Sequence, residues 1–80
     1  MKEQKIKALL DQLANDQNAN TWMYESKKVE IAKKLASLDE ANIKKVQEVI
    51  ESSSILIKES VDFSSTSYLL AQIAELINED

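Results

Sequence analysis

Apolar residues recur along the chain with the spacing of one face of an α-helix. Two segments keep this spacing without interruption, at about residues 2–15 and 65–78. Because an α-helix turns through roughly 100° per residue, positions i, i+3, i+4 and i+7 share one face. The pattern predicts two amphipathic helices, whose buried faces are formed by Ile6, Leu9, Leu10 and Leu13 and by Leu69, Leu70, Ile73, Leu76 and Ile77.

A further helix is predicted over about residues 21–37, and its apolar arc is unusually broad. Tyr24 shares a face with Ile31 and the leucines that follow it, so we expect Tyr24 in the core. Trp22 falls nearly opposite to that face, and Met23 points into the polar sector. A helix of this kind either is wedged between two neighbours or carries a second interface.

The segment at about residues 39–60 is predicted as one helix that is preceded by a capping box. In the sequence SLDE at 37–40, the Ser37 hydroxyl would accept from the backbone and Glu40 would reach back. Serines 52–54 are mediocre helix formers, so a break near Ser53 is the alternative. Continuity is favoured because one apolar stripe keeps its phase across the serines, through Ile43, Val46, Ile50, Ile57 and Val61.

Together these elements predict a single all-α domain over residues 1–80, a small antiparallel bundle of four helices. The chain has no glycine and no proline, which disfavours strand-rich folds with many tight turns. Asn15, Asn18 and Asn20 are then the best candidates for left-handed backbone after the first helix, and Asn20 or Thr21 would cap the second.

The composition removes most kinds of active site. Histidine, cysteine and arginine are all absent, which takes away the commonest general base, the most reactive nucleophile and the usual zinc ligands. No glycine-rich loop is available to bind a phosphate. We therefore expect no catalytic residue, no cofactor and no metal, and a protein that is not an enzyme.

Charge and hydropathy limit which classes of partner and which location are expected for the protein. The net charge is −4, and residues 61–80 contain four acids and no lysine. The paired lysines elsewhere are interleaved with acids, so nucleic-acid or membrane-surface binding is not favoured. The longest apolar runs have three or four residues, far below a transmembrane segment or a signal peptide. A cytoplasmic protein is expected.

One surface of the second predicted helix is the candidate contact with a partner protein. Exposed Trp and Met are typical of interface centres, and lysines on neighbouring positions would surround them. The alternative is that Trp22 folds over the preceding turn as a lid and Met23 is a single exposed apolar residue. The candidate partner-binding residues are Trp22, Met23, Ser26, Lys27, Lys33 and Lys34.

The layout resembles a family of small bacterial proteins, the immunity proteins of class IIa bacteriocins. The resemblance is carried by LLDQLAND before an asparagine-rich turn, IAKKLAS in the second helix and IKKVQEVIESSSILIKES in the third. It covers the whole chain but contains no specific motif. Membership would imply a cytosolic antiparallel four-helix bundle that recognises a bacteriocin-engaged sugar transporter. Members tend to carry a more basic C-terminus than residues 61–80 provide.

The expected function is binding to another protein, as a regulator or inhibitor and in one form as an immunity protein. An assembly or docking module, or a homodimer whose bundle is completed by a partner, is the alternative. Concentration-dependent mass separates these two classes, because an obligate dimer depends on protomer concentration. A nucleic-acid or membrane-surface binder is a third class, recognised by binding that falls steeply with added salt.

Overall fold

The two helices with uninterrupted apolar stripes lie close to where the sequence predicts them. In the computed structural model, which describes residues 1–79, α1 spans Lys2–Asp16 and α5 spans Ser67–Asn78. Their stripes form much of the core, and Ile6, Leu10, Leu13, Leu69, Leu70, Ile73 and Ile77 are at most 1% exposed. Leu76, predicted to face inward, is only partly buried at the edge of the core.

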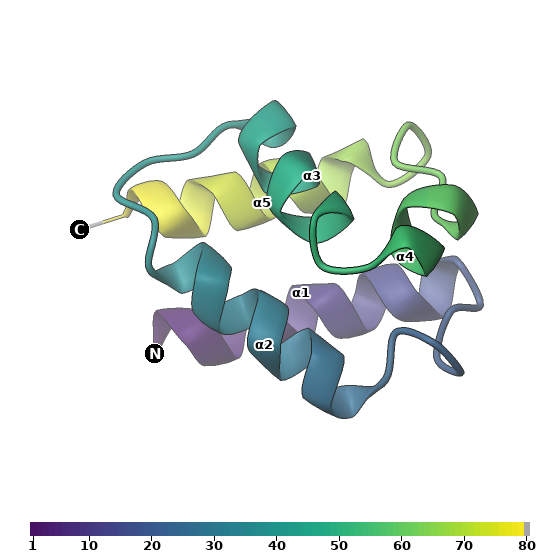
Figure 1. Cartoon of the computed structure of the whole chain (residues 1–80). Helices are drawn as coiled ribbons and strands as arrows, with labels where there is room; N and C mark the ends of the chain where they lie inside the picture. The colour runs from purple at the N-terminus through teal and green to yellow at the C-terminus, as the bar shows by residue number, and fades with distance from the viewer. Residues whose placement is uncertain (80) are drawn as a thin grey trace.

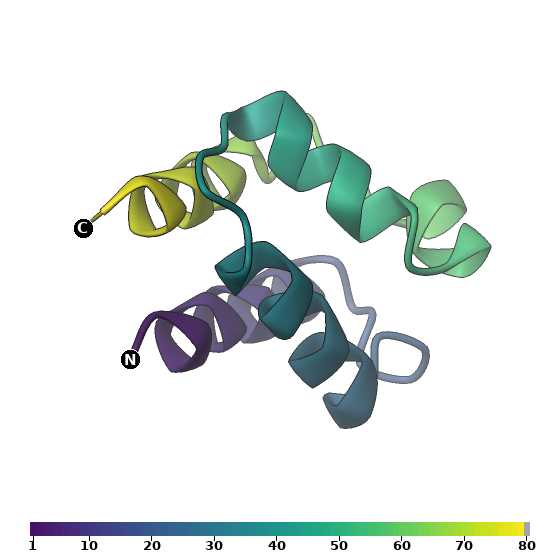
Figure 2. The ribbon, with the colours of Figure 1, turned by 60° about the vertical axis from the view of Figure 1, so that its left-hand side comes forward.

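Within residues 1–79, five helices build an all-α bundle, which confirms the predicted fold class. The elements between α1 and α5 are α2 (Glu25–Ala36), α3 (Ile43–Glu51) and α4 (Ile55–Ser60). Figures 1 and 2 show α1 and α2 in one layer and the three later helices in the other. α1 contacts both α2 and α5, and α3 contacts α2, α4 and α5, so the core lies between the layers.

The first and last helices run in opposite directions, and both termini lie at the same end of the bundle (Figure 1). Lys2 joins them there, because its Nζ donates to the carbonyl oxygens of Ile77 at 2.9 Å and Glu79 at 3.0 Å. A cation at the C-terminal end of a helix offsets the partial negative charge of the unpaired carbonyls. We call this the terminal end of the bundle and the opposite end the distal end.

The second helix begins at Glu25, four residues later than predicted. Asn18 takes left-handed backbone (φ 52°), as expected for one of the asparagines, and the chain then forms an extra turn. In this turn the Met23 amide donates to the Ala19 carbonyl at 2.7 Å, and Tyr24 follows in extended conformation (φ −80°, ψ 173°) as the N-cap residue. The predicted cap at Asn20 or Thr21 is therefore wrong.

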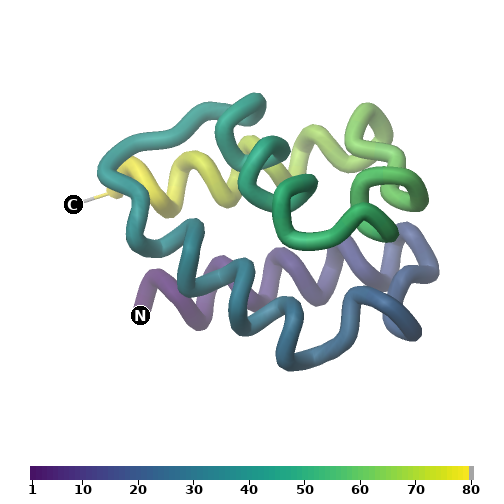
Figure 3. Tube along the Cα trace, viewed as in Figure 1, coloured from purple at the N-terminus to yellow at the C-terminus, as the bar shows by residue number. Residues whose placement is uncertain are grey.

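The predicted helix over residues 39–60 is divided into α3 and α4, so the prediction of continuity is wrong. Figure 3 shows the tube leaving the helical path between them, at the serine run. The predicted capping box is also absent, because Ser37 ends α2 and α3 starts only after Asn42. The Asn42 side chain caps α3 instead, accepting from the Lys45 amide at 2.8 Å.

Candidate protein-binding surface

Met23 and Tyr24 have exchanged the positions that the sequence predicts for them. Met23 is fully buried in the core, whereas Tyr24 is 51% exposed. The cause is the extra turn that ends at Met23, which rotates both side chains relative to a helix that starts at Thr21. Met23 therefore cannot be an exposed anchor for a partner, and that prediction is wrong.

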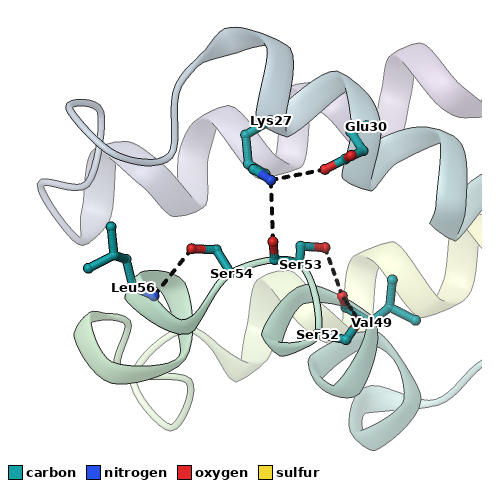
Figure 4. Close-up of polar contacts among 7 residues, drawn as sticks. All are labelled: Lys27, Glu30, Val49, Ser52, Ser53, Ser54 and Leu56. Atoms are coloured by element: carbon teal, nitrogen blue, oxygen red, sulfur yellow. Dashed lines mark hydrogen bonds and ion pairs between the residues drawn. The ribbon is translucent and has the colours of Figure 1, made fainter.

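The other residues predicted for this surface do not form one apolar centre. Trp22 is partly buried and packs against the core, as the lid interpretation expects. Ser26, Lys33 and Lys34 are exposed on α2, and their role in binding stays a prediction. Lys27 is partly buried, and its ammonium group already has partners within the bundle. Its Nζ donates to Glu30 Oε2 at 3.1 Å and to the Ser53 carbonyl at 3.2 Å (Figure 4).

Four charged residues between α1 and α2 form a connected group that we call the ionic cluster: Lys7, Asp11, Glu25 and Lys28. Lys28, only 7% exposed, lies 2.7 Å from Asp11 Oδ1 and 3.6 Å from Glu25 Oε1. Lys7 lies 3.0 Å from Asp11 Oδ2 and also pairs with Glu25. Each charge faces two of opposite sign, which compensates the desolvation of Lys28. The group has no net charge.

The ion pairs shift the pKa values of Lys7, Asp11 and Glu25 toward the charged forms. Hydrogen bonds to Glu25 and Asp11 raise the pKa of Lys7, and the Lys7 hydrogen bond lowers the pKa of Glu25. Burial acts to raise the pKa of Asp11, but hydrogen bonds from Lys28 and Lys7 outweigh burial, and the pKa is lowered. All partners are satisfied within the bundle, so the ionic cluster is a structural link between α1 and α2.

The short helix α4 presents two adjacent aliphatic side chains to solvent. Ile55 is 69% exposed and Leu56 is 53% exposed, whereas Ile57 and Val61 on the other face are buried in the core. Single exposed apolar residues are normal on protein surfaces, but neighbouring ones are a feature of contact sites. Within residues 1–79, these two are the only exposed large apolar residues that are adjacent in the sequence.

The serine run fixes where α4 begins. The Ser52 and Ser53 hydroxyls donate to the Val49 carbonyl at 2.8 and 3.1 Å, and the Ser54 Oγ accepts from the Leu56 amide at 3.2 Å (Figure 4). Serine bonds to a carbonyl one turn back bend a helix, and serine at an N-cap starts one. The Lys27 bond to the Ser53 carbonyl ties this break to α2. The exposed pair is thus held on an ordered element.

The starts of α2 and α5 also lie toward the distal end (Figure 1), and each carries a half-exposed tyrosine. Tyr24 is 51% and Tyr68 is 52% exposed. The Tyr68 hydroxyl donates to Asp16 Oδ2 at 2.6 Å, and this hydrogen bond raises the pKa of the phenol, which keeps it protonated. We use the name distal surface for Ile55 and Leu56 of α4 together with the exposed Tyr24 and Tyr68.

Gln17 joins the two long connections at this end of the molecule. Its Oε1 accepts from the Asp62 amide at 3.0 Å, and its Nε2 donates to Ser65 Oγ at 3.1 Å and to the Asp62 carbonyl at 3.4 Å. The connection after α1 is thereby fixed to the one after α4. The hydrogen bonds of Gln17 thus hold together the connections that follow α1 and α4 at the distal end.

Two hollows lie elsewhere on the molecule. One of about 350 Å³ lies between α1 and α5 and is lined by Lys5, Ala8, Leu9, Gln72, Glu75, Leu76 and Glu79. The other, of about 500 Å³, is lined by Glu40, Ala41, Asn42, Lys45 and Asn78. In the second, the Asn78 amide is already paired with the Ala41 backbone by two hydrogen bonds of 2.8 Å. Among residues 1–79, every fully buried side-chain nitrogen or oxygen has a hydrogen-bond partner.

The sequence contains a signal for the exposed pair that helical periodicity did not use. Three consecutive aliphatic residues, Ile55, Leu56 and Ile57, cannot all face one core when each is rotated by roughly 100° from the last. At least one of them must point elsewhere, because three consecutive residues span roughly 200° of the helix. The same reasoning, applied to residues 22–24, placed Tyr24 in the core and Met23 outside it, and the structure has the opposite.

Within residues 1–79, no helix has the length and apolarity to cross a membrane, and no group of three or more acidic side chains is placed to hold a metal ion. The sequence matches no family model, and no match was found among curated proteins or solved structures.

Proposed function

We propose that the protein is a non-enzymatic binding module that holds another protein on its distal surface. The observation that supports this is the exposure of Ile55 and Leu56 on α4, a helix ordered by its own cap. A large aliphatic side chain gains about 1.5–3 kcal/mol when it is fully removed from water. Burying the exposed parts of both would supply a substantial part of the free energy of a micromolar complex, about −8 kcal/mol.

The composition supports binding in place of catalysis. A chain without histidine, cysteine and arginine has few groups that act as a base or nucleophile at neutral pH. A regulator or inhibitor needs only a surface of the right shape, with an apolar centre and a polar rim. An immunity protein, as the sequence resemblance implies, would be one form of this function.

The experiment is affinity capture from a lysate of the cells that produce the protein, followed by titration of each retained protein. We expect the double substitution Ile55→Ser/Leu56→Ser to weaken the complex at least tenfold. The matched control is Ile43→Ser, since Ile43 is also an exposed isoleucine (42%) but begins α3, away from α4. Thermal unfolding of all three proteins checks that the substitutions leave the bundle folded.

Equal binding by the double variant and the wild type would contradict the proposal. Analytical ultracentrifugation tests the homodimer alternative in the same proteins. A mass that rises with concentration in the wild type, and not in the double variant, would identify the partner as a second copy.

A further inference from the structure

The two ends of the bundle differ strongly in charge. Residues 10–30 and 47–72 form the distal half: the end of α1, the start of α2, the end of α3, all of α4 and the start of α5. These segments contain eight acids and three lysines, a charge of −5, whereas the rest of the chain contains seven lysines and six acids, a charge of +1. The sum is the net charge of −4. Lys7 of the other half pairs with Asp11 and Glu25, so the distal half with the complete ionic cluster has a charge of −4, which equals the net charge of the chain.

The acids nearest to α4 are not neutralised by lysines. In the described residues, every ion pair is made by lysines of α1 or α2, in the ionic cluster or between Lys27 and Glu30. Glu59 lies on α4 itself, Asp62 follows it, and Asp16 is brought close because Gln17 binds the Asp62 backbone. All three are exposed, and the only lysine on α4 is Lys58. The exposed pair on α4 thus has exposed acids on its own helix and on the segments joined to it, and we call Asp16, Glu59 and Asp62 the acidic rim.

The partner's chemistry must complement both features. From the uncovered face of α4 and the acidic rim, we infer that the occupant of the distal surface is a basic amphipathic helix of another protein. This inference rests on the proposed function and specifies the partner. The apolar face of such a helix would cover Ile55 and Leu56, and its lysines or arginines would face Asp16, Glu59 and Asp62. Helices of this kind bind through apolar anchors at i, i+3 and i+4 or i+7.

The same charge distribution opposes two other occupants. Anionic lipid headgroups and nucleic-acid phosphates would approach a surface of like charge, which weakens association at physiological salt. Opposite charges, in contrast, raise the rate of encounter and set the orientation of the bound helix.

The test uses two synthetic helical peptides with the same leucine face, one with lysines and one with glutamates at the flanking positions. Fluorescence anisotropy of the labelled peptides with the intact protein gives both affinities. We expect the lysine peptide to bind at least tenfold more tightly, with an affinity that falls as salt is added. Ile55→Ser/Leu56→Ser should abolish its binding.

A second variant separates charge from apolar contact. Glu59→Gln/Asp62→Asn should weaken binding of the lysine peptide by about 2- to 30-fold, the range for two exposed charge pairs, and should flatten the salt dependence. Glu75→Gln is the control, since Glu75 is an exposed acid in the terminal half of α5.

Each other outcome overturns the inference. If both peptides bind equally and need Ile55 and Leu56, the distal surface binds through apolar contact and the basic partner is refuted. The basic partner is likewise refuted if Glu59→Gln/Asp62→Asn binds the lysine peptide as tightly as the wild type does. If neither peptide binds, or if phosphatidylserine vesicles or duplex DNA bind through the distal surface, the inference is also refuted. The capture experiment with Ile55→Ser/Leu56→Ser then decides separately on the proposed function.

Discussion

Replacing Met23 by alanine is the most direct test of how the connection between α1 and α2 is built. Met23 is fully buried, and truncating a buried methionine to alanine costs about 2–5 kcal/mol, depending on how far the site collapses. Because Met23 lies in a connection that can relax, we expect the lower part of this range, about 2–3 kcal/mol. A chain of this size has a free energy of unfolding of about 4–12 kcal/mol, so the loss is a large fraction.

The measurement is urea unfolding followed by circular dichroism at 222 nm, with a thermal melt in parallel. For a domain of this length, each kcal/mol corresponds to about 4–8 °C, so the melting temperature should fall by roughly 10–20 °C. The slope of the free energy against urea should not change, which would show that the folded and unfolded states keep their exposed areas.

Tyr24→Ala is the matched control, because the adjacent residue is half-exposed and should lose less than about 1 kcal/mol. A helix that started at Thr21 would reverse this order, with Tyr24 in the core and Met23 in solvent. If Tyr24→Ala proves the more destabilising of the two, the extra turn before α2 is refuted and with it the present assignment of the distal surface.

Three further predictions concern the packing that supports the distal surface. Lys28→Met should lower the free energy of unfolding by about 1–3 kcal/mol, because the buried ammonium of Lys28 pairs with two carboxylates. The control Lys33→Met, on the exposed face of α2, should change the free energy of unfolding by less than about 0.5 kcal/mol. Equal effects of the two substitutions in urea unfolding would contradict a stabilising role of the ionic cluster. Because the pKa values of Asp11 and Glu25 are lowered, the ionic cluster stabilises the fold at neutral pH, and this stabilisation is lost as pH falls below about 4.5, the ordinary glutamate value. The raised pKa of Lys7 places the corresponding loss at high pH above 10.5. Between pH 7 and pH 2 the melting temperature should therefore decline less in Lys28→Met than in the wild type. Ser54→Ala should remove about 1 kcal/mol of helix-cap stabilisation and speed amide hydrogen exchange in α4 alone, and unchanged exchange there would show that the cap is not needed.

The parts of the fold that could be predicted are those in which a single physical signal dominates. Ile6, Leu10 and Leu13 on α1, like Leu70 and Ile73 on α5, lie one helical turn apart, with polar residues on the opposite side. Only one face of each helix can be buried, so both the helix and its orientation follow from the pattern. The helix class and the core of these elements were therefore readable from the sequence.

Helix boundaries could not be read in the same way because they depend on caps that compete over a few residues. Ser37 and Asn42 are both good N-cap residues, and the sequence alone favours the capping box at Ser37. In the structure the Asn78 side chain binds the Ala41 backbone on both sides, and this contact from α5 fixes the extended chain before Asn42. A tertiary hydrogen bond between residues 37 positions apart thus decides where α3 begins.

The break before α4 shows why the candidate site itself was missed. Periodicity correctly placed Val46, Ile50 and Ile57 in the core, and the stripe keeps its phase across the serines, so a continuous helix accounts for burial as well as two helices do. The exposure of Ile55 and Leu56 does not distinguish the two either, because three consecutive aliphatic residues cannot all face one core in a continuous helix or in a broken one. The serine hydroxyls compensate locally for the interrupted backbone hydrogen bonds, and Lys27 adds a bond from another helix. The break therefore costs little, and it leaves two aliphatic residues in solvent that a partner can cover.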